Sequence, residues 1–268
     1  MNSDLRDLCA RLCRDDASLT ILNLNNGGIG TTGIKAISAA LRFNTHLVVL
    51  FLDDCSISGS GCQALAAGIA HHPALEFLFM SYNSVANTGA SALALALREN
   101  RKIQVVKLTN CGITAQGAAA LGETLRHSTT LQKLNLEGNH IGEKGALALA
   151  AGLEDNHSLL QLNIRYNGIQ RHSEMLSVFC AVLHSHNKTL QKLLLAEDTE
   201  EIEQKSKENA DDLQFYLDLN RIGRHSFGSC NVSASVWSRV LAAASRKPRL
   251  LHAVLNARPD LLHQTPVD

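Results

Sequence analysis

Histidine and cysteine are the residues of this chain that could bind a metal or act as nucleophiles. The 268-residue sequence contains 12 His and 7 Cys. His71 and His72 are adjacent, and His184 and His186 flank one Ser, but neither pair has a third ligand at a spacing typical of zinc sites. The cysteines are odd in number and form no C-x-x-C pair, so we expect reduced, buried thiols and neither a metal site nor a cofactor. They are Cys9, Cys13, Cys55, Cys62, Cys111, Cys180 and Cys230.

Short motifs of nucleotide-binding and hydrolytic enzymes give no support for catalysis. The P-loop pattern G-x-x-x-x-G-K-[ST], the G-x-S-x-G elbow and H-E-x-x-H are absent from the sequence. A glycine-rich stretch, NNGGIG at residues 25–30, falls at a turn that recurs along the chain. We interpret it as a structural turn and not as a phosphate-binding loop, and we expect a protein that is not an enzyme.

Composition excludes a strong overall electrostatic attraction to nucleic acid. Lys plus Arg equal Asp plus Glu at 25 each, and the pI is near 7.2. The sequence has no run of roughly 18 apolar residues, the length that a membrane span requires. Its first residues, MNSDLRDLCARLCRDD, lack the apolar core of a signal peptide. We expect no membrane insertion and, by default, a cytoplasmic protein, with the nucleus and organelles left open.

An eleven-residue pattern, L-x-x-L-x-L-x-x-N/C-x-I, recurs at 28-residue intervals and defines the elements that must position any site. Each copy predicts a short strand, and the apolar spacing that follows predicts a helix. A strand and a helix with one apolar face each cannot bury that face alone, so successive units must stack into a solenoid. The copies begin at Leu19, Leu47, Leu75, Ile103, Leu131 and Leu159, and a seventh begins at Leu190.

The repeats resemble the leucine-rich repeat family, in its ribonuclease-inhibitor-like class with repeats of 28 to 29 residues. The resemblance covers about residues 19–195. It implies an α/β solenoid, a horseshoe with a parallel β-sheet on the concave face and helices on the convex face. It implies little about chemistry, because the same fold serves inhibitors, GTPase activators, innate immune sensors and cytoskeletal or ciliary scaffolds.

We expect one solenoid domain with distinct ends. Residues 1–18 form an N-terminal helical cap or partial repeat, and residues 19–195 form six full repeats and a degenerate seventh. Residues 196–212 form an acidic loop, because residues 197–212 contain eight acids against two lysines. Residues 213–268 form a C-terminal strand and helical cap, the strand being indicated by the alternation of Phe215, Leu217 and Leu219.

The outward positions of the strands differ from repeat to repeat. They are apolar and aromatic in the second to fourth repeats and polar or basic later, where Lys192 continues the series. Adjacent strands lie ~4.8 Å apart, so the apolar positions should form one contiguous patch. An apolar centre beside charged side chains is typical of a protein-binding surface. The candidate binding residues are Val49, Phe51, Phe77, Phe79, Tyr82, Val105, Lys107, Lys133, Glu137 and Arg165.

These residues predict a non-enzymatic interaction module that binds a protein or peptide of unknown identity through its concave face, either as a monomer or as a subunit of a complex. The first alternative is that the acidic segment or the C-terminal cap covers the patch. Two others follow from the resemblance: a GTPase-activating or regulatory protein of the Ran-activator type, and a structural subunit of a larger ciliary or organellar assembly. Against the GTPase alternative, the turn NNGGIGTTG offers no Arg to stabilise transition-state charge.

Overall fold

Strands and helices alternate along almost the whole described chain. The computed structural model describes residues 3–169, 173–195 and 204–221, together with positions 252, 253 and 256. The helices are α1 (Ser3–Cys13), α2 (Gly30–Leu41), α3 (Gly59–Ile69), α4 (Ala86–Glu99), α5 (Ala115–His127), α6 (Gly142–Glu154), α7 (Ser173–Ser185) and α8 (Gln204–Arg221). The strands are β1 (Ile21–Asn23), β2 (Val49–Phe51), β3 (Phe77–Phe79), β4 (Val105–Lys107), β5 (Lys133–Asn135), β6 (Gln161–Asn163) and β7 (Lys192–Leu194).

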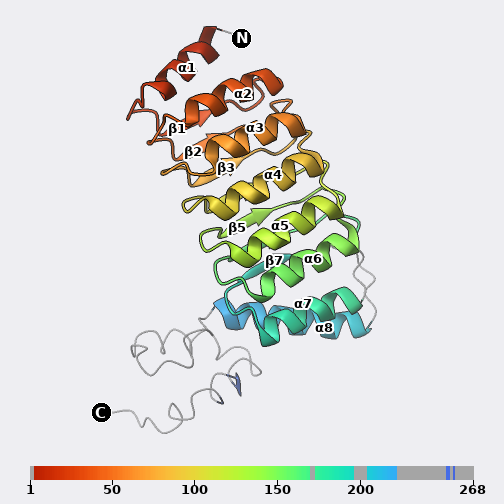
Figure 1. The fold of residues 1–268 in the computed structure, drawn as a ribbon. Helices are drawn as coiled ribbons and strands as arrows, with labels where there is room; N and C mark the ends of the chain where they lie inside the picture. The colour runs from red at the N-terminus through yellow and green to blue at the C-terminus, as the bar shows by residue number, and fades with distance from the viewer. Residues whose placement is uncertain (1–2, 170–172, 196–203, 222–251, 254–255, 257–268) are drawn as a thin grey trace, which may run out of the picture.

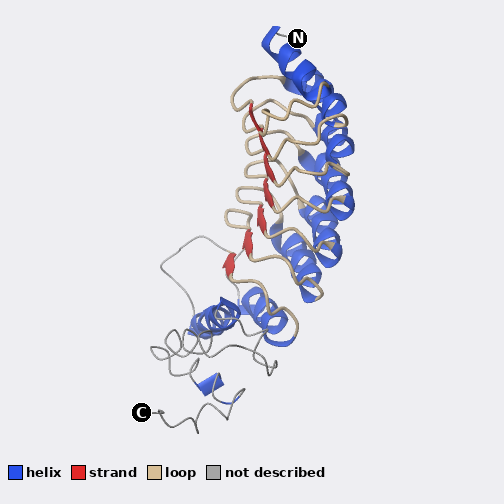
Figure 2. Cartoon of the chain, turned by 90° about the vertical axis from the view of Figure 1, so that its left-hand side faces the viewer, coloured by secondary structure: helices blue, strands red, loops and turns tan. Residues whose placement is uncertain are grey.

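The strands form one parallel sheet, and the helices stack beside one another on its outer side. The seven strands lie in sequence order, β1 to β7. Leu22, Leu50 and Leu78 are paired in register across the first three strands, so each repeat adds one strand at an equivalent position. In the side view the sheet lies on the inner side of the arc and the helices on the outer side (Figures 1 and 2). The predicted α/β solenoid with a parallel sheet is therefore confirmed.

The core lies between the sheet and the helices. The pattern leucines point into it, and Leu47, Leu50 and Leu52 are fully buried, as are Leu65 and Ile69 on the inner face of α3. Small residues allow the helices to approach each other closely. A Cβ placed on Gly152 of α6 would overlap the carbonyl oxygen of Gly122 on α5. The small residues of the repeat thus set the spacing between neighbouring helices.

The Asn of the repeat pattern satisfies backbone groups where the chain turns inward after each strand. The Oδ1 atom of Asn83 accepts hydrogen bonds from the N–H groups of Cys55 (3.1 Å) and Ile57 (2.9 Å). Its Nδ2 group donates to the carbonyl oxygens of Leu52 (2.8 Å) and Met80 (2.9 Å). One buried side chain therefore joins two repeats and satisfies backbone groups of both.

A second row of polar side chains, not predicted from the sequence, lies where helices lead to the following strands, and several of its asparagines join two repeats. Asn100 is representative: its Oδ1 atom accepts from the N–H groups of Lys102 (2.7 Å) and Ile103 (2.8 Å), and its Nδ2 group donates to the Ile69 carbonyl (2.8 Å). The members that precede β2 to β7 lie at the start of the connection into the strand, so they fix where each of these strands begins, whereas Asn220 lies within α8. Its members are Asn44, His72, Asn100, Ser128, Asn156, Asn187 and Asn220.

The C-terminal part of the array differs from the prediction. Helix α8 runs continuously through residues predicted as an acidic loop and as a strand, so the boundary at residues 212 and 213 and the strand at 215–219 are wrong. Leu213, Leu217 and Asn220 are buried at helical spacing, and Asn220 donates to the Leu190 carbonyl (2.8 Å). The seventh repeat therefore has its own helix. The acidic residues 196–203 and most of the cap expected at 222–268 lie outside the described residues.

Three of the six described cysteines are buried, and Cys9 and Cys180 are half-buried. Cys55, Cys62 and Cys111 are buried, and burial raises the pKa of the Cys111 thiol to about 12. Cys13 is exposed on α1, so the expectation of burial is wrong for this residue, and Cys230 lies outside the described residues. Among the described residues, no group of three or more His, Cys, Asp and Glu could hold a metal ion. Within the same part of the chain, no helix is long and apolar enough to cross a membrane.

Candidate functional site

Two parallel rows of side chains cover the concave face of the sheet. On each strand the middle residue is buried, and the residues on either side of it lie on the concave surface of the sheet. In-register pairing aligns these outward residues across the strands. The first row is Ile21, Val49, Phe77, Val105, Lys133, Gln161 and Lys192. The second row is Asn23, Phe51, Phe79, Lys107, Asn135, Asn163 and Leu194.

The apolar patch, defined as Val49, Phe51, Phe77, Phe79 and Val105, lies on β2, β3 and β4. The structure brings these residues together as the sequence predicts, because Val49 pairs with Phe77, Phe77 with Val105, and Phe51 with Phe79. The rings of Phe51 and Phe79 stack with centroids 4.8 Å apart and planes inclined by 12°. All five side chains are half-buried, since they cover part of one another. The patch is therefore preformed rather than a set of separately exposed rings.

Two further aromatic or apolar side chains lie near this region. Ile21, which is outside the predicted set, is 58% exposed at the β1 end of the first row and extends the apolar surface. Tyr82 is 59% exposed on the turn after β3, where its backbone has a φ of 60°. Among the described residues Tyr82 stacks with no other ring, so it lies beside the patch rather than within it.

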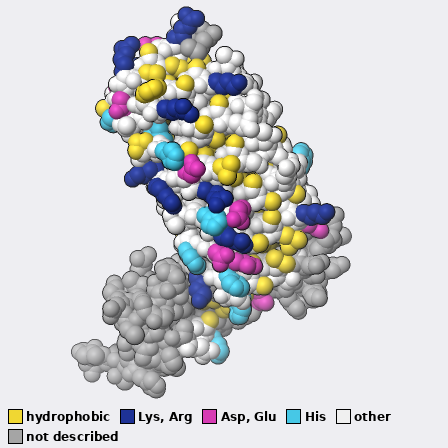
Figure 3. Space-filling view, in the orientation of Figure 1, with side chains coloured by type: hydrophobic (Ala, Val, Ile, Leu, Met, Phe, Trp, Pro, Cys, Tyr) yellow, Lys and Arg dark blue, Asp and Glu magenta, His cyan; other side chains and the backbone are white. Residues whose placement is uncertain are grey.

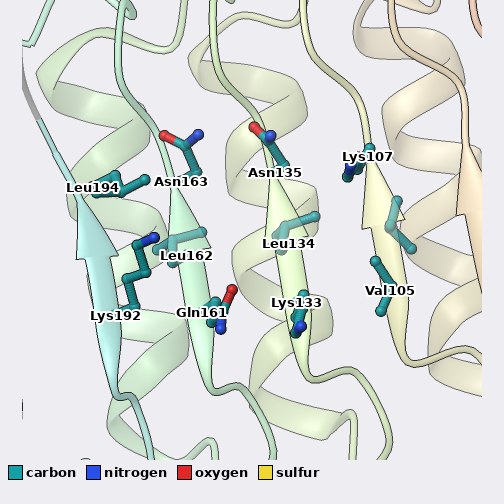
Figure 4. A pocket seen from close by; sticks show the side chains of 11 residues that line it. Val105, Lys107, Lys133, Leu134, Asn135, Gln161, Leu162, Asn163, Lys192 and Leu194 are labelled. Atoms are coloured by element: carbon teal, nitrogen blue, oxygen red, sulfur yellow. The ribbon is translucent and has the colours of Figure 1, made fainter.

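A basic hollow adjoins the apolar patch on β4 to β7. It is a depression of about 200 Å³, and Figure 4 shows its outward side chains in two rows across the strands, with Leu134 and Leu162 between them. Lys107, Lys133 and Lys192 are exposed, and no carboxylate is among the lining residues. The Nζ atom of Lys107 lies 4.9 Å from the ring centroid of Phe79, a cation–π contact that connects the hollow to the patch. The remaining lining residues are Val105, Val106, Leu134, Asn135, Gln161, Leu162, Asn163 and Leu194.

Glu137 and Arg165 occupy the rim, where β5 and β6 end. The Oε2 atom of Glu137 accepts a hydrogen bond from Asn163 Nδ2 (2.8 Å), and its N–H group donates to Asn135 Oδ1 (2.9 Å). The N–H group of Arg165 donates to Asn163 Oδ1 (3.1 Å). The amide side chains of the second row thus fix the turns on which both predicted rim residues lie. The sequence pattern indicates Asn135 and Asn163 as outward positions but does not show this bonding.

The basic hollow is lined by lysine, amide and apolar side chains. Its lining residues include no Ser, Cys, His, Asp or Glu. The histidines considered as metal ligands lie elsewhere: His72 is buried at the end of α3, and His71 pairs with Glu99 at 3.5 Å on the surface. Ammonium groups, amides and an aromatic patch can bind a partner in a defined orientation.

The glycine-rich turn between β1 and α2 has the spacing G-x-G-x-x-G at Gly28, Gly30 and Gly33. The repeat accounts for these glycines. Gly30 has a φ of 60°, and Gly142, the corresponding residue four repeats later, has the same φ. A Cβ on Gly33 would approach Ile29 Cβ within 2.8 Å. The adjacent groove is lined by Asp4, whose negative charge opposes phosphate binding, so we assign no nucleotide site here.

The helical face differs from the concave face. Figure 3 shows charges of both signs spread over it, with isolated apolar side chains between them. Opposite charges pair on this face: Arg126 Nε lies 3.3 Å from Asp155 Oδ2, and His127 Nε2 lies 2.9 Å from Glu123 Oε1. Such exposed pairs contribute little to the stability of the fold. The segregation of an apolar patch from unpaired positive charges is a feature of the concave face.

Comparison with known proteins identifies the repeat. A family model described as "Leucine Rich repeat" matches residues 16–38, 43–66, 99–122 and 127–150. No curated protein matches the chain. Two solved structures match the chain. One is leiomodin-1 actin-binding site 2, with 18% identity, a TM-score of 0.40 and coverage of 84% of this chain and 96% of that chain. The other is the Caenorhabditis elegans tropomodulin C-terminal domain, with 11% identity, a TM-score of 0.38 and coverage of 84% of this chain and 99% of that chain.

Both TM-scores are below 0.5, so these two neighbours do not inform us about partners. The four family matches instead coincide with the repeats seen in the structure, where seven parallel strands alternate with stacked helices. The chain is a leucine-rich repeat protein.

Proposed function

We propose that the chain is a protein-interaction module that binds a protein or peptide segment through its concave face. The observation that carries this proposal is the apolar patch, in which five apolar side chains from three adjacent strands form one surface that is open to solvent. Solenoids of this kind typically bind partners on an extended concave surface. Contiguous apolar patches on soluble proteins commonly mark such sites.

The composition of the surface supports protein recognition. Aromatic residues at the centre of an interface supply most of its binding energy, and polar residues at the rim set its specificity. Here Phe51 and Phe79 form the stacked centre, and Lys107 lies beside them. Because the rings are already packed against each other, little side-chain entropy is lost on binding.

The proposal is tested by removing the aromatic side chains of the patch. We expect the variant F51S/F77S/F79S to lose the specific partners that the wild-type chain captures from an extract of its source cells, as measured by quantitative mass spectrometry. The control is F43S/L95S/L147S, which removes three exposed apolar side chains that lie outside the two concave rows. All proteins are compared at equal folded fraction, determined by circular dichroism. Equal capture by the wild-type chain and the F51S/F77S/F79S variant would contradict the proposal.

No observation favours the GTPase-regulating alternative. The turn after β1 carries no Arg, and the residues that line the basic hollow are three lysines together with amide and apolar side chains. A lysine provides a point charge rather than the planar fork that an arginine offers to a phosphate. We therefore propose no second function.

A further inference from the structure

We propose that the concave face recognises an extended segment of about nine residues that is apolar at one end and acidic at the other. This inference rests on the proposed function and specifies the chemistry of the partner. It follows from the order of side chains along the two rows, which changes once from apolar to basic. The apolar part covers β1 to β4, and the basic part covers β4 to β7.

The positive charge of the basic hollow is not neutralised within the described part of the chain. Lys107, Lys133 and Lys192 all line the hollow, and none of them is in an ion pair with a described residue. Glu137, at the rim, uses Oε2 to accept a hydrogen bond from Asn163. Three unpaired ammonium groups around one depression favour a ligand that brings several negative charges.

The length of the ligand follows from the sheet. A segment that crosses all seven strands passes six inter-strand steps of ~4.8 Å, or about 29 Å, and an extended chain advances ~3.3 Å per residue, so about nine residues are required. Asn135, Gln161 and Asn163 lie in the basic half and can donate to or accept from the backbone of such a segment. Apolar side chains of the ligand would then contact the patch while its carboxylates contact the lysines.

The stacking of the rings favours an acidic peptide over a single-stranded nucleic acid. Nucleic-acid sites of this type need aromatic faces on which bases can stack. Phe51 and Phe79 each cover one face of the other, and Lys107 lies over the ring of Phe79. Both faces of Phe79 and one face of Phe51 are therefore occupied, whereas ring edges and the side chains of Val49 and Val105 can contact an apolar residue.

The test is a selection of random nonapeptides, displayed as a library, on the full chain. We expect the selected peptides to be enriched in aromatic or aliphatic residues towards one end and in Asp and Glu towards the other. The variant K107Q/K133Q/K192Q should still select the apolar residues but lose the acidic enrichment. It should bind a selected acidic peptide at least about tenfold more weakly, because each lysine–carboxylate contact is lost. The control K35Q/K144Q/K188Q removes the same charge outside the concave rows and should behave as wild type.

The outcomes separate this inference from the proposed function. The inference would be overturned if no peptide were selected, or if the selected peptides lacked acidic enrichment. It would also be overturned if wild type and K107Q/K133Q/K192Q selected peptides with the same acidic enrichment. If peptides selected without acidic enrichment still required Phe51 and Phe79 for binding, the proposed function would stand. Binding of a single-stranded oligothymidine as tight as that of the acidic peptide would also overturn the inference. Self-association of the wild-type chain can be measured by analytical ultracentrifugation. If K107Q/K133Q/K192Q abolished such self-association, the occupant of the concave face would be a second copy of the chain, and the inference would be overturned.

Discussion

At the scale of single residues, the array is held together by side chains that replace backbone partners, and His72 is the exception among them. It occupies the place that Asn44, Asn100 and Asn156 hold in other repeats. Its Nδ1 atom accepts from the N–H groups of Ala74 (3.3 Å) and Leu75 (3.0 Å), so the ring proton is on Nε2, which is buried and has no hydrogen-bond partner among the described residues. An asparagine at this position could instead donate to the preceding repeat, as Asn100 does.

His72 should make the stability of the fold depend on pH. Burial lowers its pKa from 6.5 to about 4. The unfolded state therefore binds a proton between these values while the folded state does not, and stability is full above pH 6.5 and falls as the pH decreases towards 4. We expect His72 to reduce the free energy of unfolding by about 1–2 kcal/mol between pH 7 and pH 5. H72N should be more stable than wild type and lack this part of the pH dependence, as measured by urea unfolding at both pH values. An identical pH dependence in H72N would refute this assignment.

At the scale of the elements, neighbouring helices pack with their backbones in direct contact. The contact between Gly122 of α5 and Gly152 of α6 leaves no room for a methyl group. Glycine is a poor helix former, so the sequence places it in these helices for packing and not for helix stability.

The substitution G152A separates these two effects. Helix propensity alone would stabilise the variant by about 1 kcal/mol, whereas overpacking costs about 1–3 kcal/mol or more because the Gly122 carbonyl must move. We expect a net decrease of about 1–2 kcal/mol in the free energy of unfolding, as measured by urea denaturation. A variant as stable as or more stable than wild type would show that the helices can separate without cost.

Helix α8 is an element whose type the sequence pattern did not predict correctly. Phe215, Leu217 and Leu219 alternate as in a strand, but Leu213, Leu217 and Asn220 also fit one face of a helix. Short segments satisfy both periods, and packing against α7 decides between them. No neighbouring repeat of equal length was available to settle the choice, because the chain departs from the regular spacing after Leu159.

At the scale of the whole molecule, a strict period predicts most of the architecture. Each repeat of 28 residues places equivalent residues on equivalent elements, so the strand order and the two outward rows follow from the sequence. The pairing of Phe51 with Phe79 could be predicted from the same register. The stacked rings and the depression around the three lysines could not, because side-chain conformation and the curvature of the sheet are set by packing between repeats.

We propose that the concave face contacts the partner, and site-specific photo-crosslinking can detect this contact. The photoreactive residue p-benzoylphenylalanine replaces Phe77, at the middle of the patch in the first row, or Leu95, which is 61% exposed on α4. Both proteins are irradiated in an extract of the source cells, and the adducts are identified by mass spectrometry. We expect position 77 to give specific adducts that position 95 does not give. An excess of F43S/L95S/L147S, added as a competitor, should suppress these adducts, whereas an excess of F51S/F77S/F79S should not. The same adducts from both positions, or adducts from position 95 alone, would contradict the claim.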